Sequence, residues 1–140
     1  MASYQKYETF VEHFANKLID AFGATDTWKA VIHTDAPNLT TDTQISDLIQ
    51  IAGSNGYTTD GTSIAFTSTR SGGTVTATAT DVTWTATGGN LGASTTGRYF
   101  SIVNSTANRL MCVFDYSATF TVAVGETMTL DFGASLFTLA

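Results

Sequence analysis

The sequence predicts a mainly-β fold: an antiparallel β-sandwich of jelly-roll type, preceded by an N-terminal amphipathic helix. The 140 residues include 27 threonines and 12 glycines but a single proline, and β-branched threonine favours half-buried strands while glycine favours turns. Apolar residues alternate with polar ones in roughly nine short segments, a spacing typical of sandwiches and barrels. No helical pattern alternates with these segments, which excludes a parallel α/β sheet.

The helix is expected in residues 1–23. Apolar residues recur there at three- and four-residue spacing, the pattern of one helix face. The members of this stripe are Tyr4, Tyr7, Val11, Phe14, Leu18 and Phe22, widened by Phe10 and Ile19. Ser3 is placed to cap the start and Gly23 to end the helix. Two roles for the stripe stay open: packing on the domain's own sheet, which we favour, or docking on a partner.

The sandwich is expected in residues 24–140, so that 1–140 form a single domain. Strands are predicted at residues 27–33, 63–71, 74–80, 82–87, 98–104, 110–116, 118–124, 128–132 and 136–139. Residues 34–44 are polar, contain the proline and predict a loop. Residues 45–52 fit either a helical turn or a short strand. The periodicity predicts one core that contains Trp84, Phe114, Phe120, Leu130 and Phe132.

Two details of the pattern constrain the strands. The apolar set shifts by one residue at Thr80-Asp81, and such a slip would turn every later side chain to the other face. These residues must therefore form a bulge, a bend or a strand break. In residues 110–116, Leu110, Cys112 and Phe114 are expected on one face, with apolar residues on the other as well. A strand that is apolar on both faces is central or covered twice.

Composition narrows the function. Charged residues make up 13% and the net charge is −6 at pH 7, which argues against general binding of nucleic acid, because that needs a basic face. No apolar run approaches the ~20 residues of a membrane-spanning helix, and the first residues lack the apolar core of a secretion signal. The lone Cys112 excludes an internal disulfide and a multi-cysteine zinc site.

The sequence contains few candidates for catalytic or metal-binding residues. His33 and Asp35 lie two apart on a predicted strand and could form half of a catalytic or metal pair, but the sequence offers no third group. His13 with Glu12 lacks the partner that a zinc helix supplies. Cys112 lies in the most apolar strand and is expected to be inert. We therefore predict no catalytic, cofactor-binding or metal-binding residues, and no enzymatic activity.

Other polar or aromatic groups are also expected to be structural or incidental. The scattered carboxylates give no calcium pattern, the two tryptophans fall on apolar strand faces, and two glycosylation triplets are chance matches in a threonine-rich chain. The carboxylates are those of Asp60, Asp81 and Asp131, and the tryptophans are Trp28 and Trp84. The glycosylation triplets begin at Asn38 and Asn104.

Five segments, in order along the chain, carry a family resemblance. They are Tyr-x-x-Tyr-x-x-Phe-Val-Glu at residues 4–12, Thr-x-Ala-Pro at 34–37, Asn-Gly-Tyr-Thr followed by Gly at 55–61, Asp-Val-x-Trp-Thr-Ala-x-Gly-Gly at 81–89, and Gly-Glu-Thr-x-Thr-x-Asp-Phe at 125–132. With them the chain resembles the capsid cement, or decoration, proteins of tailed bacteriophages, which are small virion structural proteins. It departs from their pattern in a longer loop at residues 90–97.

The resemblance implies a jelly-roll protein without catalytic residues or cofactors. It implies binding to the outside of a shell of HK97-type major capsid proteins, and hence a location on the outer capsid surface. A symmetric shell favours a homo-oligomer, with a dimer favoured and a trimer possible. The alternative is a tail or baseplate fibre component that binds a host glycan. That function needs exposed aromatic residues in the loops at 90–97 or 104–108, which contain none.

Overall fold

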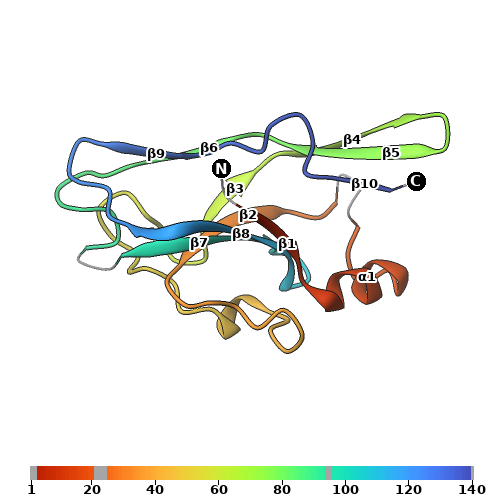
Figure 1. Ribbon diagram of the computed structural model, residues 1–140, viewed down its shortest axis with the longest axis horizontal. Coiled ribbons are helices and arrows are strands. Elements are labelled where there is room, and N and C mark those ends of the chain that lie inside the picture. Colours follow the sequence, from red (N-terminus) through yellow and green to blue (C-terminus); the bar gives the residue numbers. More distant parts are fainter. Residues whose placement is uncertain (1–2, 21–24, 94–95, 140) are drawn as a thin grey trace.

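The computed structural model describes residues 3–20, 25–93 and 96–139. It is mainly β, with antiparallel sheets arranged in two layers (Figure 1). One layer is a five-stranded sheet of order β1-β8-β7-β2-β3. Its strands are β1 (Ser3–Lys6), β2 (Trp28–His33), β3 (Thr62–Ile64), β7 (Gly97–Asn104) and β8 (Arg109–Phe120). One short helix, α1 (Glu8–Ala15), follows β1.

The second layer consists of two small sheets placed end to end. A three-stranded sheet of order β10-β5-β4 contains β4 (Phe66–Ser71), β5 (Thr74–Ala79) and β10 (Phe137–Leu139), and β6 (Val82–Thr85) pairs with β9 (Thr127–Leu130). The predicted phase slip is confirmed as a strand break: β5 ends before Thr80 and β6 begins after Asp81. The Asp81 carboxylate accepts a hydrogen bond from the Phe132 amide at 2.9 Å, which fixes the break.

The main core lies between the two layers. Trp84 and Phe100 stack across it with ring centroids 5.8 Å apart, and Phe100 stacks on Phe120 at 5.3 Å. Of the predicted core set, Trp84, Leu130 and Phe132 are buried, whereas Phe114 and Phe120 are partly buried against the same cluster. The expected core is thus confirmed, with its two outermost members nearer the surface.

A second cluster covers the opposite, outer face of the five-stranded sheet. It contains Tyr7, Val31, Leu48, Tyr99, Val103, Leu110 and Val113. Its lid is residues 34–52, an irregular segment that includes the 3₁₀ turn η1 (Ile45–Asp47). The helical turn considered for 45–52 is confirmed, and Gln50 beyond it forms an isolated bridge with His33. The prediction that residues 110–116 are covered on both faces is confirmed for residues 110–113, whereas Tyr116 is 46% exposed.

The helix expected over residues 1–23 is wrong in extent. Ser3–Lys6 form a strand, because pairing with β8 satisfies the backbone groups on one side of the segment and places the Tyr4 ring edge-on to Phe114, centroids 5.5 Å apart. Ser3 therefore caps no helix. Among residues 3–20, eight are α-helical, and Val11 and Leu18 of the expected apolar stripe are about half exposed. Phe22 and Gly23 lie outside the described residues.

Three strand predictions also need correction. The single strand expected at 63–71 is two strands, β3 and β4, which lie in different sheets and are divided at Ala65. Leu110 does not share a face with Cys112, because Cys112 pairs with Ile102 while Leu110 pairs with Val103. Met111 is thus an extra residue, a bulge that reverses the alternation. The strand expected at 118–124 is instead the end of β8, which stops at Phe120.

We predict that truncation of the buried Phe100 destabilises the fold strongly, whereas truncation of the exposed, apolar Ile49 does not. Phe100→Ala should lower the free energy of unfolding by about 3–5 kcal/mol, since it leaves a cavity among stacked rings. Ile49 is 64% exposed, so Ile49→Ala should change it by less than about 0.5 kcal/mol. Chemical denaturation measures both. Equal losses in the two variants would contradict the described packing.

Candidate functional site

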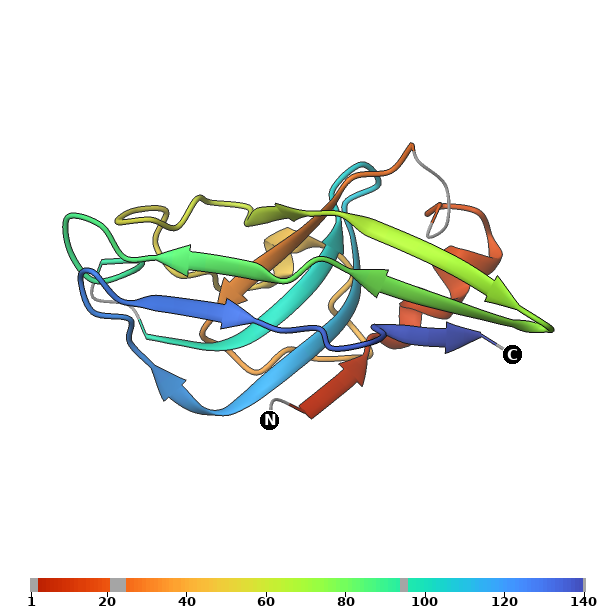
Figure 2. The same ribbon diagram turned by 90° about the horizontal axis from the view of Figure 1, so that it is seen from above.

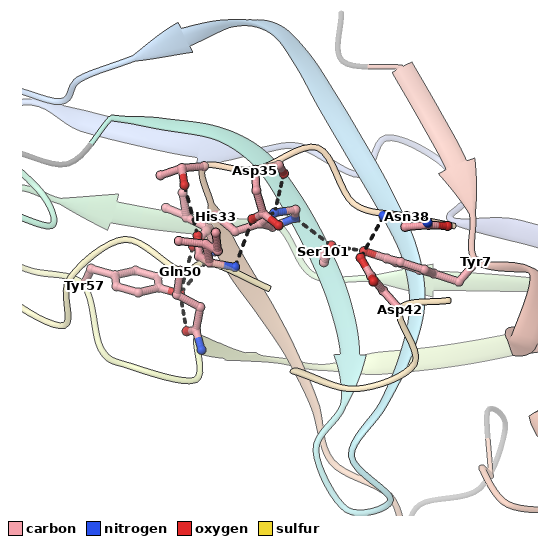
Figure 3. Close-up of polar contacts among 11 residues, drawn as sticks. Tyr7, His33, Asp35, Asn38, Asp42, Gln50, Tyr57 and Ser101 are labelled. Carbon is pink, nitrogen blue, oxygen red and sulfur yellow. Dashed lines mark hydrogen bonds and ion pairs between the residues drawn. The ribbon is translucent and has the colours of Figure 1, made fainter. Parts of the chain in front are cut away.

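A line of hydrogen bonds joins a serine, a histidine and an aspartate beneath the lid (Figure 3). His33 Nε2 lies 2.9 Å from Ser101 Oγ, and His33 Nδ1 lies 3.0 Å from the backbone oxygen and 3.3 Å from the carboxylate of Asp35. The hydroxyl of Tyr7 also lies 2.9 Å from Ser101 Oγ. Serine, histidine and aspartate in this order are the groups that hydrolases use to activate a nucleophile.

The strand pairing brings these residues together. Antiparallel pairing of β2 with β7 sets Val31 opposite Ser101, so that His33, two residues further along β2, reaches Ser101 from the same face. Tyr7 follows β1 and is anchored by its amide to the Met111 carbonyl at 3.1 Å. The sequence pointed to His33 and Asp35 but missed Ser101 and Tyr7. The one available signal was Ser101 as a polar residue within the apolar stretch 99–103.

The environment of the serine argues against nucleophilic catalysis. Tyr7, His33 and Ser101 have no exposed surface, so Ser101 Oγ is closed to a substrate and already shared by two partners. Burial lowers the pKa of His33 and raises that of Tyr7, which keeps both neutral near pH 7. The His33 ring also stacks on Tyr99, centroids 5.3 Å apart.

This network fastens the lid to the sheet. The carboxylate of Asp35 accepts a hydrogen bond from the Ile49 amide at 2.9 Å, and the Thr34 amide donates to the Ile49 carbonyl at 3.0 Å. Beside it, the Tyr57 hydroxyl lies 3.1 Å from the Gln50 side-chain oxygen (Figure 3). The buried polar groups thus hold both ends of the lid, a structural role.

The other sequence candidates are placed apart. His13 is buried on α1, and burial together with the charge of Arg109 lowers its pKa. Cys112 is fully buried, and burial raises its pKa, so it is a thiol. Within residues 3–20, 25–93 and 96–139, no three His, Cys, Asp or Glu side chains lie close enough to hold a metal ion.

Both tryptophans are core residues, as expected from their strand faces. Trp28 stacks on Phe66 with centroids 4.9 Å apart, and Trp84 Nε1 donates to Thr62 Oγ1 at 2.8 Å. Neither therefore offers a surface platform for a sugar ring. In the part of the chain that the structure describes, no helix has the length and apolar character needed to cross a bilayer.

The open side of the sandwich is the second candidate. On the opposite side, β3 and β4 are joined through Ala65, so the chain itself passes from one layer to the other. On the open side, β1 ends one layer while β9 and β10 end the other, and no strand joins them (Figure 2). All four residues of β1 are exposed.

Two apolar grooves flank Tyr4 on this open side. The first, about 400 Å³, lies between β1, β8 and β9 and is lined by Phe114, Tyr116, Met128, Asp131 and Phe132 among others. The second, about 320 Å³, is lined by Tyr4, Lys6, Phe10, Val11, Phe137, Thr138 and Leu139. Tyr4, Val11 and Leu139 remain 41%, 51% and 39% exposed. An apolar surface beside a free strand edge is typical of protein–protein contact.

The lowered pKa of His33 predicts that acid weakens the fold. At a pH between the pKa of His33 in the folded chain and the unfolded value of about 6.5, the unfolded chain binds a proton that the folded chain does not bind. The contribution of His33 to stability is therefore complete above about pH 6.5 and is lost as the pH falls. The free energy of unfolding should drop from about pH 7.5 to about pH 5.5, and less steeply in His33→Asn. The control variant His13→Asn should keep the part of the pH dependence that is due to His33. An unchanged slope in His33→Asn would contradict a neutral, buried His33.

No protein-family model, curated protein or solved structure matches this chain. A proposal for its function therefore rests on its own residues: a polar network whose serine and histidine are buried under the lid, and an apolar, unpaired side of the sandwich.

Proposed function

We propose that the protein is a non-enzymatic virion structural protein of a tailed bacteriophage, a capsid cement protein. In this proposal it binds the outside of a shell of major capsid proteins and stabilises the joints between subunits. The observation that carries the proposal is the open side of the sandwich, where a free strand edge meets two apolar grooves. In the group of Ser101, His33 and Asp35, which has the order of a catalytic triad, Ser101 and His33 have no exposed surface.

A cement protein acts by contact. It has to bury surface on its neighbours and, where an edge strand is available, extend their sheets by backbone hydrogen bonds. The open side offers both: the free edge of β10 for backbone pairing, and Val11 and Leu139 as exposed apolar groups. These groups are costly to leave in water and are covered when a partner docks.

The charge of the chain is compatible with this role. Charged residues are 13% of the chain, with twelve acids against six bases, so docking on a shell would depend mainly on apolar contact. A basic docking region on the shell would add attraction to a protein of net charge −6, and salt would weaken that part alone.

A jelly-roll fold is part of the same proposal. The family resemblance implies a jelly roll, and two antiparallel layers with a chain that passes between them at β3–β4 support it. Assignment as a cement protein also implies a location on the outer capsid surface, no enzymatic activity and no cofactor. Host-glycan binding, the alternative from the sequence, gains no support from the buried Trp28 and Trp84.

We predict that particles that carry the protein withstand more heat and mechanical pressure than particles without it. The measurement is the temperature and the force at which shells release their contents, with and without added protein. Equal resistance would contradict the cement role, as would electron-microscopic images that place the protein on the tail.

Surface variants locate the contact. Val11→Asp puts a charge on the open side, whereas Ile49→Asp puts the same charge on an exposed apolar residue of the lid. We expect Val11→Asp to reduce binding to shells at least tenfold and Ile49→Asp to leave it unchanged. The reverse ranking would show that the lid, and not the open side, faces the shell.

A further inference from the structure

We propose that the free edge of β1 pairs with β1 of a second copy of this chain, around a two-fold axis at Gln5. The inference stands on the geometry of β1 and holds or fails independently of the proposed function. Strand β1 has β8 on one side and no strand of the described chain on the other. Such an edge is a template for another strand unless something blocks it.

Lys6 is the one charge on this edge, and the proposed register makes it a contact. Ser3–Lys6 contain no proline, glycine or bulge, and they pair with residues 112–115 of β8 in unbroken register. The Tyr7 amide donates to Met111 of β8, and ladder bonds alternate along an antiparallel strand. The N–H and C=O groups of Tyr4 and Lys6 therefore point away from β8, toward the place of the second copy.

Symmetry and the pleat limit the register. A two-fold axis perpendicular to the sheet keeps residues of the same parity opposite one another, since both must lie on the same face. Placing the axis at Gln5 sets Tyr4 opposite Lys6 of the other copy, twice. Both pairs then exchange their outward N–H and C=O groups and form four backbone hydrogen bonds.

The side chains favour this register over the one with its axis at Lys6. A Lys6 ammonium of one copy lies next to the Tyr4 ring of the other, a cation–π contact, beside the groove that Asp131 also lines. Moving the axis to Lys6 would instead set two lysines directly opposite, which is destabilising. The occupant of the edge that matches this charge pattern is therefore a second copy, and the two five-stranded sheets become one.

A cysteine at the axis tests the proposal. In the proposed register Gln5 faces Gln5 of the second copy as a pair without mutual backbone bonds, where the Cβ atoms are closest and fit a disulfide. Purified Gln5→Cys should therefore form a covalent dimer under mild oxidation. Ser3→Cys is the matched control: it is exposed on the same face, but two copies of residue 3 lie about 13 Å apart along the strand, too far to bridge. Native Cys112 is fully buried and does not interfere.

Light scattering on the unmodified chain gives a second measurement. The wild type should have the molar mass of a dimer. Lys6→Pro removes an outward N–H, spares the pairing with β8 and should have the mass of a monomer with unchanged circular dichroism. A monomeric wild type, no covalent dimer from Gln5→Cys, or equal cross-linking of Ser3→Cys would overturn the proposal. No capsid is present in the cross-linking or the light-scattering experiment, so their results do not depend on the cement role.

Discussion

The structure depends on one constraint: the strands β2, β7 and β8 are apolar on both faces, and both faces must be kept from water. The second β layer covers the inner face with the stacked rings around Phe100. The outer face has no second sheet and is covered by residues 34–52, which have little regular structure. An irregular lid needs fixed anchors for its backbone polar groups. The network of His33, Ser101 and Asp35 provides them. A constellation that in another setting would activate a nucleophile thus stabilises the fold.

The same two-layer arrangement leaves one side of the sandwich with unpaired backbone and exposed apolar residues. At β3–β4 the chain itself runs from one layer to the other through Ala65. The opposite side, between β1 and β10, is left with unpaired backbone and with apolar residues such as Val11 and Leu139. Proteins commonly protect such an edge with charge, proline or a bulge. Along β1 the one such protection is the charge of Lys6. The two proposals use different parts of this side: the edge of β1 pairs with a second copy, while the edge of β10 and the apolar groups beside it remain for the shell.

The sequence predicted the strands better than the site. Alternation located β2, β5, β6, β7 and β10 to within a few residues, and the phase slip at Thr80-Asp81 marked the break between sheets. It failed where tertiary pairing outweighed the local pattern: Tyr4 has helical spacing with Tyr7, but its backbone pairs with β8. The bulge at Met111 likewise leaves no trace in a run of apolar residues. Ser101 and Tyr7 could not be connected with His33, since they meet only once β2 lies beside β7. The open side was equally hidden, because it depends on which strands end each sheet.

The central claim is that the open side of the sandwich is the surface by which this protein binds its shell. Hydrogen exchange, followed by mass spectrometry on free protein and on protein bound to capsid shells, tests it most directly. The account predicts slower exchange on binding in peptides that contain α1 and β10, with no change in the lid at residues 34–52. Protection of the lid, with α1 and β10 exchanging as in the free protein, would contradict it.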